Sequence, residues 1–325
     1  MAVDAKNKEA VEGLYKLKKR TKDKPLILFL KSQRRLINFV KKIPPSALKL
    51  MNYFWPGSLT LVFEANIGKW PLVTEEGKIG VRVPFHPVPL NIAEDEDILL
   101  AATSANISGE KAVADPKNLS EKIKEAVDIL IDTGPSPSGE ESTVVDVTFF
   151  PPKILRKGKI REEKIREVLS EPTRILFVCS GNVCRSVMAE YLFKKFWPSE
   201  YQQKVEVTSA GTSALSSSSP SRLTREVMEK RKIDVSSHRS RYTDLSIISR
   251  SDLVLVMEEK HKNYLNKIYP QAKEKIFMLS EFASGKKENI IDPLNQSETF
   301  YEKTCQIIER EIKKLIKKLG VGDNK

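Results

Sequence analysis

The second half of the chain alternates short apolar runs with amphipathic stretches. Apolar runs bounded by turn residues predict strands, whereas apolar residues at three- and four-residue spacing predict helices. The pattern predicts strands at 174–178, 204–208, 252–257 and 276–279, and helices at 188–196, 222–232, after residue 257 and at 299–319. Strands that alternate with helices in this way predict a parallel sheet covered by helices on both faces.

The first half is less regular, and its pattern is that of an α/β or α+β domain. It predicts helices at 8–19, 33–42 and 119–126, and strands at 27–30, 59–63, 79–83, 98–102 and 143–147. A charged helix at 161–169 is followed by Ser-Glu-Pro-Thr, which interrupts the pattern before the next strand. We therefore predict a first domain at 1–169, a linker at 170–173 and a second domain at 174–325.

Composition narrows the class of protein. A chain of 325 residues suits two domains, and its formal charge of +12 favours phosphate-bearing partners or simply a soluble surface. The 3 cysteines are too few for a secreted disulfide scaffold. The sequence has neither a long apolar span nor a signal-peptide pattern at MAVDAKNKEA, so we expect a soluble, cytoplasmic protein without membrane contact.

The most specific motif is Cys-Ser-Gly-Asn-Val-Cys-Arg-Ser at Cys179–Ser186, between a predicted strand and a predicted helix. Backbone N–H groups at a helix N-terminus bind anions, and Gly181 would permit a backbone turn that a Cβ hinders. In that field the thiolate of Cys179 should be favoured, and Arg185 can grip two phosphate oxygens. We predict that Cys179 attacks phosphorus while Arg185 holds the transferring group. The alternative is a chance spacing around a buried cysteine. The predicted phosphate loop also includes Ser180, Gly181, Asn182, Val183, Cys184 and Ser186.

This loop resembles that of the low-molecular-weight protein-tyrosine phosphatases. The resemblance runs from Arg174 to about Leu319 and includes Ser209-Ala-Gly-Thr212 and Ser237-His-Arg-Ser240. It implies a three-layer, parallel-sheet domain that hydrolyses phosphomonoesters through a cysteinyl-phosphate intermediate, without a cofactor or metal. The implied substrate is a phosphorylated protein or a small aryl phosphate.

The same resemblance assigns roles to particular side chains. It implies that Asp292, followed by Pro293, is the general acid, and that Asn182 and Ser186 order the loop. It also implies a reversible disulfide between Cys184 and Cys179; a packed, inert Cys184 is the alternative. Cys305, on the final predicted helix, is expected to be structural. Arsenate reductases relay electrons through two further cysteines, and only Cys305 is available downstream, which disfavours that activity.

Two substrate classes stay open for the second domain. Relatives that act on phosphotyrosine usually carry aromatic residues after Asp-Pro, where this chain has Leu294 and Asn295. Relatives that act on phosphoarginine have threonine in place of Val183, and a valine lacks the hydroxyl such a site would use. We therefore expect an aryl phosphate substrate, with protein-arginine phosphatase activity as the alternative.

Short polar segments in the first half occur in a recognisable order. They are Lys18-Lys-Arg20 with Lys24, Gly80-Val-Arg-Val-Pro84, Ser104-Ala-Asn-Ile-Ser-Gly109, Glu141-Ser-Thr-Val-Val-Asp146 and Ile154-Leu-Arg-Lys-Gly158. In this order they resemble the YrdC family of threonylcarbamoyl-AMP synthases over nearly all of residues 1–160. The resemblance implies a twisted-sheet α/β domain that joins L-threonine, bicarbonate and ATP (with Mg) for tRNA threonylcarbamoyladenosine formation. Implied partners are tRNA, or double-stranded RNA more generally, and tRNA-modification proteins.

The resemblance also implies a basic cleft in the first domain. Lys18, Arg20, Lys24 and Arg156 would face phosphates, Arg82 the threonine carboxylate, and Ser104, Asn106 and Ser142 the nucleotide or amino acid. The family opens with a strand and a Pro-Thr-Asp/Glu-Thr-x-Tyr-Gly-Leu loop, and this chain begins after it. Two expectations follow: the recorded start is internal to a longer gene, or the domain is a non-catalytic nucleotide- or RNA-binding module. Oligomeric state and cooperation between the domains stay open.

Overall fold

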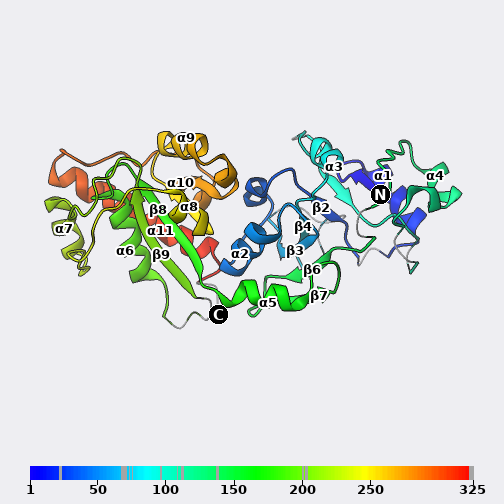
Figure 1. Ribbon diagram of the computed structural model, residues 1–325, viewed down its shortest axis with the longest axis horizontal. Helices are drawn as coiled ribbons and strands as arrows, with labels where there is room; N and C mark the ends of the chain where they lie inside the picture. The colour runs from blue at the N-terminus through cyan, green and yellow to red at the C-terminus, as the bar shows by residue number, and fades with distance from the viewer. Residues whose placement is uncertain are drawn as a thin grey trace. The chain divides into compact units, whose positions relative to one another are not determined.

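The protein is described by a computed structural model that covers residues 1–321 apart from 22–23, 67–71, 73, 75, 96, 108, 111–112, 137–138, 200 and 202–203. The chain forms two compact units (Figure 1). The first unit comprises Met1–Lys41 and Tyr53–Leu169, and the second comprises Lys42–Asn52 and Ser170–Lys325. The domain limits 1–169 and 174–325 remain a prediction.

The first unit is built on a mixed sheet of 7 strands in the order β1-β5-β2-β4-β3-β6-β7. Its strands are β1 (Ala2–Asp4), β2 (Ile27–Phe29), β3 (Leu59–Glu64), β4 (Lys78–Arg82), β5 (Leu100–Ala102), β6 (Thr143–Asp146) and β7 (Lys153–Arg156). Its helices are α1 (Lys8–Lys18), α3 (Pro87–Ile92), α4 (Glu121–Ala126) and α5 (Glu162–Ser170), while α2 (Pro45–Phe54) is divided between the two units. Strand β3 runs parallel to β6 and antiparallel to β4, so an α/β class with a mixed sheet is confirmed.

Several short elements of the first unit differ from the prediction. The helix predicted at 33–42 is a 3-10 helix at Gln33–Asn38, and the chain then reaches Pro44 and Pro45. Helix α2 begins at Pro45, where a proline is favourable because the first helical N–H needs no partner. The prediction missed β1, β7 and α3, which are too short to show much periodicity. It also missed the 10-residue α2, whose residues 45–51 are all buried and so do not alternate between apolar and polar faces.

The second unit contains a parallel sheet of 4 strands in the order β11-β10-β8-β9. The strands are β8 (Thr173–Cys179), β9 (Val205–Gly211), β10 (Leu253–Val256) and β11 (Ile276–Met278). The helices are α6 (Arg185–Phe196), α7 (Arg222–Glu229), α8 (Leu245–Arg250), α9 (Glu259–Ile268), α10 (Leu279–Ser284) and α11 (Glu298–Lys318). This confirms the predicted parallel sheet, to which the structure adds the short helices α8 and α10.

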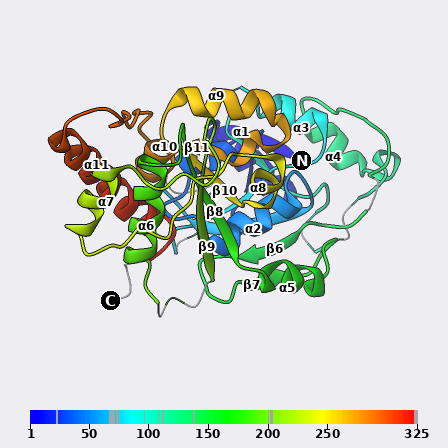
Figure 2. The same ribbon diagram turned by 60° about the vertical axis from the view of Figure 1, so that its left-hand side comes forward.

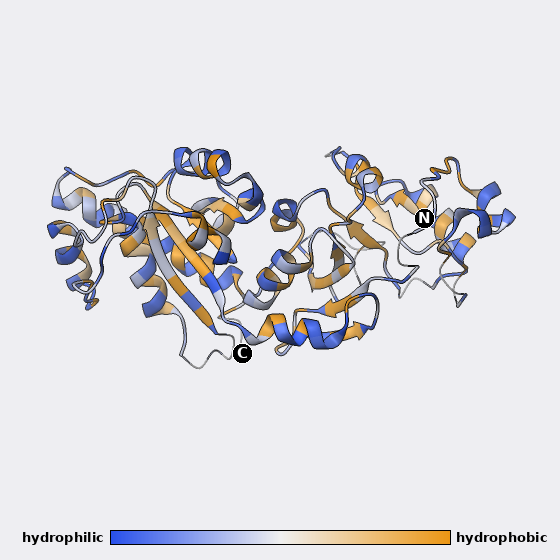
Figure 3. Ribbon diagram, in the orientation of Figure 1, coloured by the Kyte–Doolittle hydropathy of each residue, from blue (hydrophilic) through white to orange (hydrophobic). Residues whose placement is uncertain are grey.

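Helices cover both faces of the second sheet. Ile248 of α8 and Leu265 of α9 share one core with Leu176 and Val178 of β8. Figure 2 shows α6, α7 and α11 grouped together on the other side of the strands, and α6 packs on β8 and β9. Strands buried on both faces are apolar along most of their length, as β8 and β10 are, and β8 is largely orange in Figure 3. The outer strand β9 instead carries the exposed Glu206 and Thr208.

The strand order marks the carboxyl end of β8 as a position where a ligand can bind. Strand β8 pairs with β9 on one side and with β10 on the other, so the chain changes direction across the sheet at β8. In open parallel sheets, the crevice at the carboxyl end of such a strand is where ligands bind. Here that end is Cys179, and the residues after it lead directly into α6.

Candidate functional site

The loop between β8 and α6 owes its shape to Asn182. This residue has the left-handed backbone conformation, with φ of 54°. The prediction that Gly181 permits a turn which a Cβ would hinder is wrong. A Cβ on Gly181 would meet Val183 Cγ2 at 3.5 Å, which is an ordinary van der Waals contact. Asparagine tolerates this conformation because its side chain bonds locally. Asn182 Nδ2 donates to Ser186 Oγ and to Ser209 Oγ, both at 2.9 Å.

Cys179 is buried at the centre of this loop. Its Sγ lies 3.0 Å from Ser186 Oγ and accepts the Asn182 N–H at 3.3 Å. Met188 N–H bonds to Cys184 O at 2.9 Å, which leaves the N–H groups before it outside the helical ladder, and the Ser186 N–H bonds to Cys179 instead. Burial raises the pKa of Cys179, while Arg185 and Ser186 act in the opposite direction. The expected stabilised thiolate is therefore not met in this arrangement.

Arg185, which acts to lower the pKa of Cys179 but does not outweigh burial, has a fully buried side chain. Its Nη1 donates to Glu258 and, at 2.9 Å, to the carbonyl of Ile290. Its Nη2 donates to Asp292 and lies 3.4 Å from Ser180 Oγ. The guanidinium is thus engaged by two carboxylates. Burial acts to raise the pKa of Glu258, but hydrogen bonds from Arg185 and Lys260 outweigh it and hold that pKa below its ordinary value.

The structure thus places the three predicted catalytic side chains around one point, with Asp292 joined to Arg185 by an ion pair. The sequence reasoning missed Glu258 and His261, which reach the loop from the start of α9. His261 Nε2 lies 2.9 Å from Ser180 Oγ. No local motif marks these two residues, because only the pairing of β10 with β8 brings α9 to the loop.

A second ring of polar groups holds Asn182 from behind. His238 Nε2 lies 3.0 Å from the Asn182 carbonyl, and Arg241 N–H donates to Asn182 Oδ1 at 3.0 Å. Ser209 Oγ donates to Glu190 Oε2 at 2.6 Å. Ser209 and His238 belong to the two short segments that carried the sequence resemblance, so their contacts explain why those segments accompany the loop. Glu190 had no sequence signal.

Cys184 lies at the loop's end, against helix α11. Its Sγ is 3.3 Å from Ser221 Oγ and 3.5 Å from the Tyr301 hydroxyl. Burial, together with the Cys184 contact, raises the pKa of Tyr301 to about 12, so the phenol stays protonated. Cys179, Cys184 and Cys305 are all buried free thiols. The reversible disulfide stays a prediction.

The loop passes so close to Gly211 that this position has no room for a side chain. A Cβ on Gly211 would lie 2.3 Å from the Ser180 carbonyl oxygen and 2.9 Å from Asn182 N, both of them backbone atoms. We expect Gly211→Ala to push the loop away and destabilise the second unit by about 1–3 kcal/mol. The matched variant Gly181→Ala, which meets only ordinary contacts, should keep its unfolding temperature. Calorimetry compares the two, and equal unfolding temperatures would show that the loop yields freely.

In the first unit, Lys18 is buried between two residues of the segment after β5. Its Nζ donates to Ser104 O at 2.6 Å and to Asn106 Oδ1 at 2.9 Å. Ser104 Oγ also donates to Asn106 Oδ1, at 2.6 Å. Burial and then the nearby Arg20 lower the pKa of Lys18 to about 8, while Glu141 opposes the shift. These residues form a compact cluster with a cation at its centre.

A second cluster surrounds Ser142. Arg156 Nη2 donates to Ser142 O at 2.9 Å and to Ser142 Oγ at 3.0 Å, and its Nη1 pairs with Glu141 at 3.0 Å. Thr60 Oγ1 lies 2.9 Å from Ser142 Oγ. Burial, followed by repulsion from Arg156, lowers the pKa of Arg82. Glu141 connects the two clusters, because its carboxylate pairs with Arg156 and also acts on the charge of Lys18.

Two predicted residues contribute less than expected. Arg20 donates to the carbonyls of Lys24 and Pro25 at 2.7 and 2.9 Å, so its guanidinium helps to fix its own loop. The contacts of Lys24 are made through its backbone N–H and carbonyl, and the residue is exposed. Thr60 and Glu141 were missed as individual site residues, although Glu141 lies in a segment that the sequence singled out.

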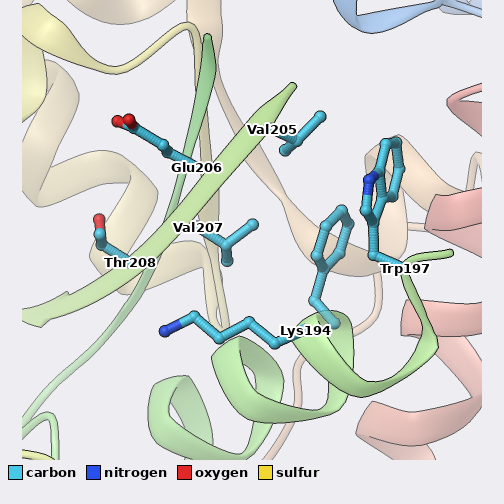
Figure 4. Close-up of a pocket in the computed structure, with 7 residues that line it drawn as sticks. Lys194, Trp197, Val205, Glu206, Val207 and Thr208 are labelled. Atoms are coloured by element: carbon cyan, nitrogen blue, oxygen red, sulfur yellow. The ribbon is translucent and has the colours of Figure 1, made fainter. Parts of the chain in front are cut away.

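A pocket of about 420 Å³ opens beside the outer strand of the second unit (Figure 4). It is lined by Phe193, Lys194, Trp197, Val205, Glu206, Val207 and Thr208. Val205 pairs with Thr173 at the start of β8, whereas Gly211 pairs with Cys179 at its end. The strand residues that line the pocket thus lie about 10–20 Å along this strand pair from the loop, and the pocket is not part of the site.

Within the described ranges, no three His, Cys, Asp or Glu side chains gather closely enough to hold a metal ion. Among the helices of the described chain, none has both the length and the apolarity needed to cross a membrane.

Together, the fold and the two sites define a parallel-sheet α/β domain with a cysteine and an arginine in the loop after a central strand, and a mixed-sheet domain with a basic, hydroxyl-rich cluster. Residues 1–158 match the profile of the Sua5/YciO/YrdC family, described as telomere recombination. Residues 174–324 match low molecular weight phosphotyrosine protein phosphatase. The chain belongs to both families, one through each unit, as the sequence resemblance predicted.

Individual relatives agree with this division. The first unit is similar to the putative threonylcarbamoyl-AMP synthase of Mycobacterium tuberculosis strain H37Rv, with 33% identity over 178 residues that cover 54% of this chain and 82% of that protein. The second is similar to the low molecular weight protein-tyrosine-phosphatase Ptp of Acinetobacter johnsonii, with 35% identity over 135 residues that cover 42% and 89%. The YwlE arginine phosphatase structure from Geobacillus stearothermophilus is 36% identical, covers 46% of this chain and 93% of that one, and has a TM-score of 0.43. The chain spans 51% of the threonylcarbamoyl-AMP synthase of Pyrococcus abyssi.

Proposed function

We propose that the second unit is a phosphatase of the protein-tyrosine type. It would hydrolyse phosphomonoesters by transferring the phosphoryl group first to Cys179 and then to water. The observation that carries this proposal is the grouping at the end of β8. Cys179 Sγ lies beside the first turn of α6, and the fully buried Arg185 pairs with Asp292. A nucleophile, a bidentate cation and an acid are the groups that phosphoryl transfer needs.

The pairing of Arg185 suggests how the site would work. An incoming phosphate competes with Asp292 and Glu258 for the guanidinium, and bidentate binding frees Asp292. The freed Asp292 carboxylate takes up the proton that the Cys179 thiol loses. The resulting thiolate, which Ser186 and the Asn182 N–H stabilise, forms an S–P bond while the P–O bond to the leaving group breaks, and Asp292 passes the proton on to the leaving oxygen. Water then attacks phosphorus, Asp292 takes the proton from that water, and the thiolate leaves.

The substrate we propose is an aryl phosphate on a protein or small molecule. Val183 offers no hydroxyl to a guanidine nitrogen, which favours an aryl ester over phosphoarginine. The test compares a phosphotyrosyl peptide, p-nitrophenyl phosphate and phosphoarginine. We expect the first two to be hydrolysed and kcat/KM for phosphoarginine to be lower by about tenfold or more. Phosphoarginine as the best substrate would overturn this assignment.

For the first unit we propose threonylcarbamoyl-AMP synthesis from L-threonine, bicarbonate and ATP with Mg, in support of tRNA modification. The supporting observation is the buried Lys18, held by Ser104 and Asn106 beside the Arg156 cluster, since a triphosphate and a carboxylate both need cations. The test is release of pyrophosphate from ATP that depends on both threonine and bicarbonate. Salt-dependent tRNA binding without product would instead identify a non-catalytic binding module.

The lowered pKa of Lys18 predicts that the affinity of this unit for ATP depends on pH. Because that pKa is about 8, Lys18 loses its charge as the pH rises through that value, whereas an ordinary lysine would keep it. We expect ATP affinity to fall about tenfold from about pH 7 to about pH 9. Lys18→Gln should bind weakly at both pH values with a flat profile. Calorimetric titration with ATP measures this, and an unchanged slope in Lys18→Gln would exclude Lys18 as the titrating group.

A further inference from the structure

The imidazole of His261 contacts the phosphate loop but has no part in the mechanism above. His261 is 2% exposed, and its Nε2 lies 2.9 Å from Ser180 Oγ. Its Nδ1 is buried and has no hydrogen-bond partner within the described chain. A buried polar atom without a partner reduces stability, so a histidine in this place needs an explanation beyond packing.

Ser180 connects His261 to the phosphate-binding arginine. Arg185 Nη2 can only donate, so the Ser180 hydroxyl oxygen accepts at this 3.4 Å contact. A serine side chain has three staggered positions, and the contact to His261 selects the one that puts Oγ beside Nη2. When a phosphate displaces the carboxylate of Asp292, Ser180 remains a protein group that holds this nitrogen in place.

The groups around the imidazole of His261 keep it uncharged beside the Arg185 guanidinium. Burial and then Arg185 lower the pKa of His261 to about 4, with Lys260 acting in the same direction and with Glu258 and Asp292 opposing. The ring is therefore neutral near pH 7 and does not repel the guanidinium. A neutral ring can anchor a hydroxyl beside a cation, whereas a protonated ring or a lysine would add a second positive charge to a buried site.

We propose that His261 is a positioning residue, which fixes Ser180 Oγ so that Arg185 Nη2 stays in the orientation that grips a phosphate oxygen. This inference rests on the proposed phosphatase function of the second unit. It adds to that function a chain of three side chains, from α9 through the loop to the first residue of α6.

The test is a double-mutant cycle on the full chain, with p-nitrophenyl phosphate as substrate. We expect His261→Leu and Ser180→Ala each to lower kcat by about tenfold, and the double variant to be no worse than either alone. His261→Gln, which keeps a polar atom near the position of Nε2, should recover to within about threefold of wild type. The exposed Asn263→Ala on the same helix is the control and should leave kcat unchanged.

Two results would overturn the proposal. Losses that multiply in the double variant would mean that the two residues act independently. Equal losses in His261→Leu and His261→Gln, with the unfolding temperature of both lowered, would mean that the imidazole only packs.

Binding of inorganic phosphate to the same proteins separates this inference from the proposed function. If wild type binds phosphate but hydrolyses no ester, the phosphatase proposal fails. The positioning role is then supported if His261→Leu, Ser180→Ala and the double variant share one weakened Kd. If the affinity of His261→Leu for phosphate equals that of wild type, the positioning role is wrong whether or not the protein hydrolyses esters. A wild-type protein that binds no phosphate would overturn both.

Discussion

Replacing Cys179 with serine is expected to lower the hydrolysis of p-nitrophenyl phosphate by about a thousandfold or more while the second unit stays folded. The change replaces one atom, and Asn182, Ser186 and Arg185 keep their places around it. A serine hydroxyl at this position is almost entirely protonated near neutral pH, so the nucleophile is lost while phosphate binding survives. Steady-state kinetics and phosphate titration measure the two quantities separately.

The matched control for this change is Cys305→Ala. Cys305 is also buried, but it lies on α11 with its Sγ 3.9 Å from Met228 Sδ, and burial raises its pKa to about 12. We expect this variant to retain the wild-type kcat. Hydrolysis at the wild-type rate in Cys179→Ser, or an equal loss in both variants, would contradict the assignment of the nucleophile.

Replacing Asp292 with asparagine is expected to slow phosphoryl transfer to Cys179 by an amount that depends on the leaving group. An asparagine keeps the size of the side chain but has no proton to donate to the leaving oxygen. Phenyl phosphate needs that proton, so the rate of this first step should fall by about 100-fold or more, whereas with p-nitrophenolate, a stable anion, as leaving group it should fall by less than about tenfold. The pre-steady-state burst of phenol release, measured for a series of substituted phenyl phosphates, gives this dependence.

The same substitution also removes the ion pair between Asp292 and Arg185. Loss of the pair alone would change the affinity for all esters alike, so dependence on the leaving group identifies the acid. Asp234→Asn, at an exposed position in the same unit, is the control and should behave as wild type. An equal loss for every leaving group would exclude Asp292 as the proton donor.

Much of the second site was predictable because its parts are close in sequence. Cys179 and Arg185 are separated by one loop, and the apolar strand before it and the helix after it set the loop at the carboxyl end of a central strand. The partners of Arg185 were harder to predict. Glu258 and Ile290 are distant in sequence and reach it only through the parallel order of the strands. The left-handed turn at Asn182 was missed because glycine is the commoner residue for such a backbone.

The first unit shows more clearly which features the hydrophobic and polar pattern of a sequence cannot predict. Its longer amphipathic helix α1 was predicted to within one residue, but β1 and β7 are too short to show alternation. Lys18 and Asn106 are 88 residues apart and meet around a single buried ammonium group. Their order along the chain suggested a shared site, whereas the exposure of Lys24 could not be read from its place in a basic cluster.

The most direct test of the central claim is to locate the phosphoryl group on the protein. Asp292→Asn should form the phosphoryl-cysteine readily from p-nitrophenyl phosphate but hydrolyse it slowly, because no carboxylate activates the attacking water. Mass spectrometry of the alkaline-quenched, digested protein should then find one phosphoryl group, on the peptide that contains Cys179, and none in the Cys179→Ser protein. Turnover without a phosphoryl group on Cys179, or with one on another residue, would contradict the account.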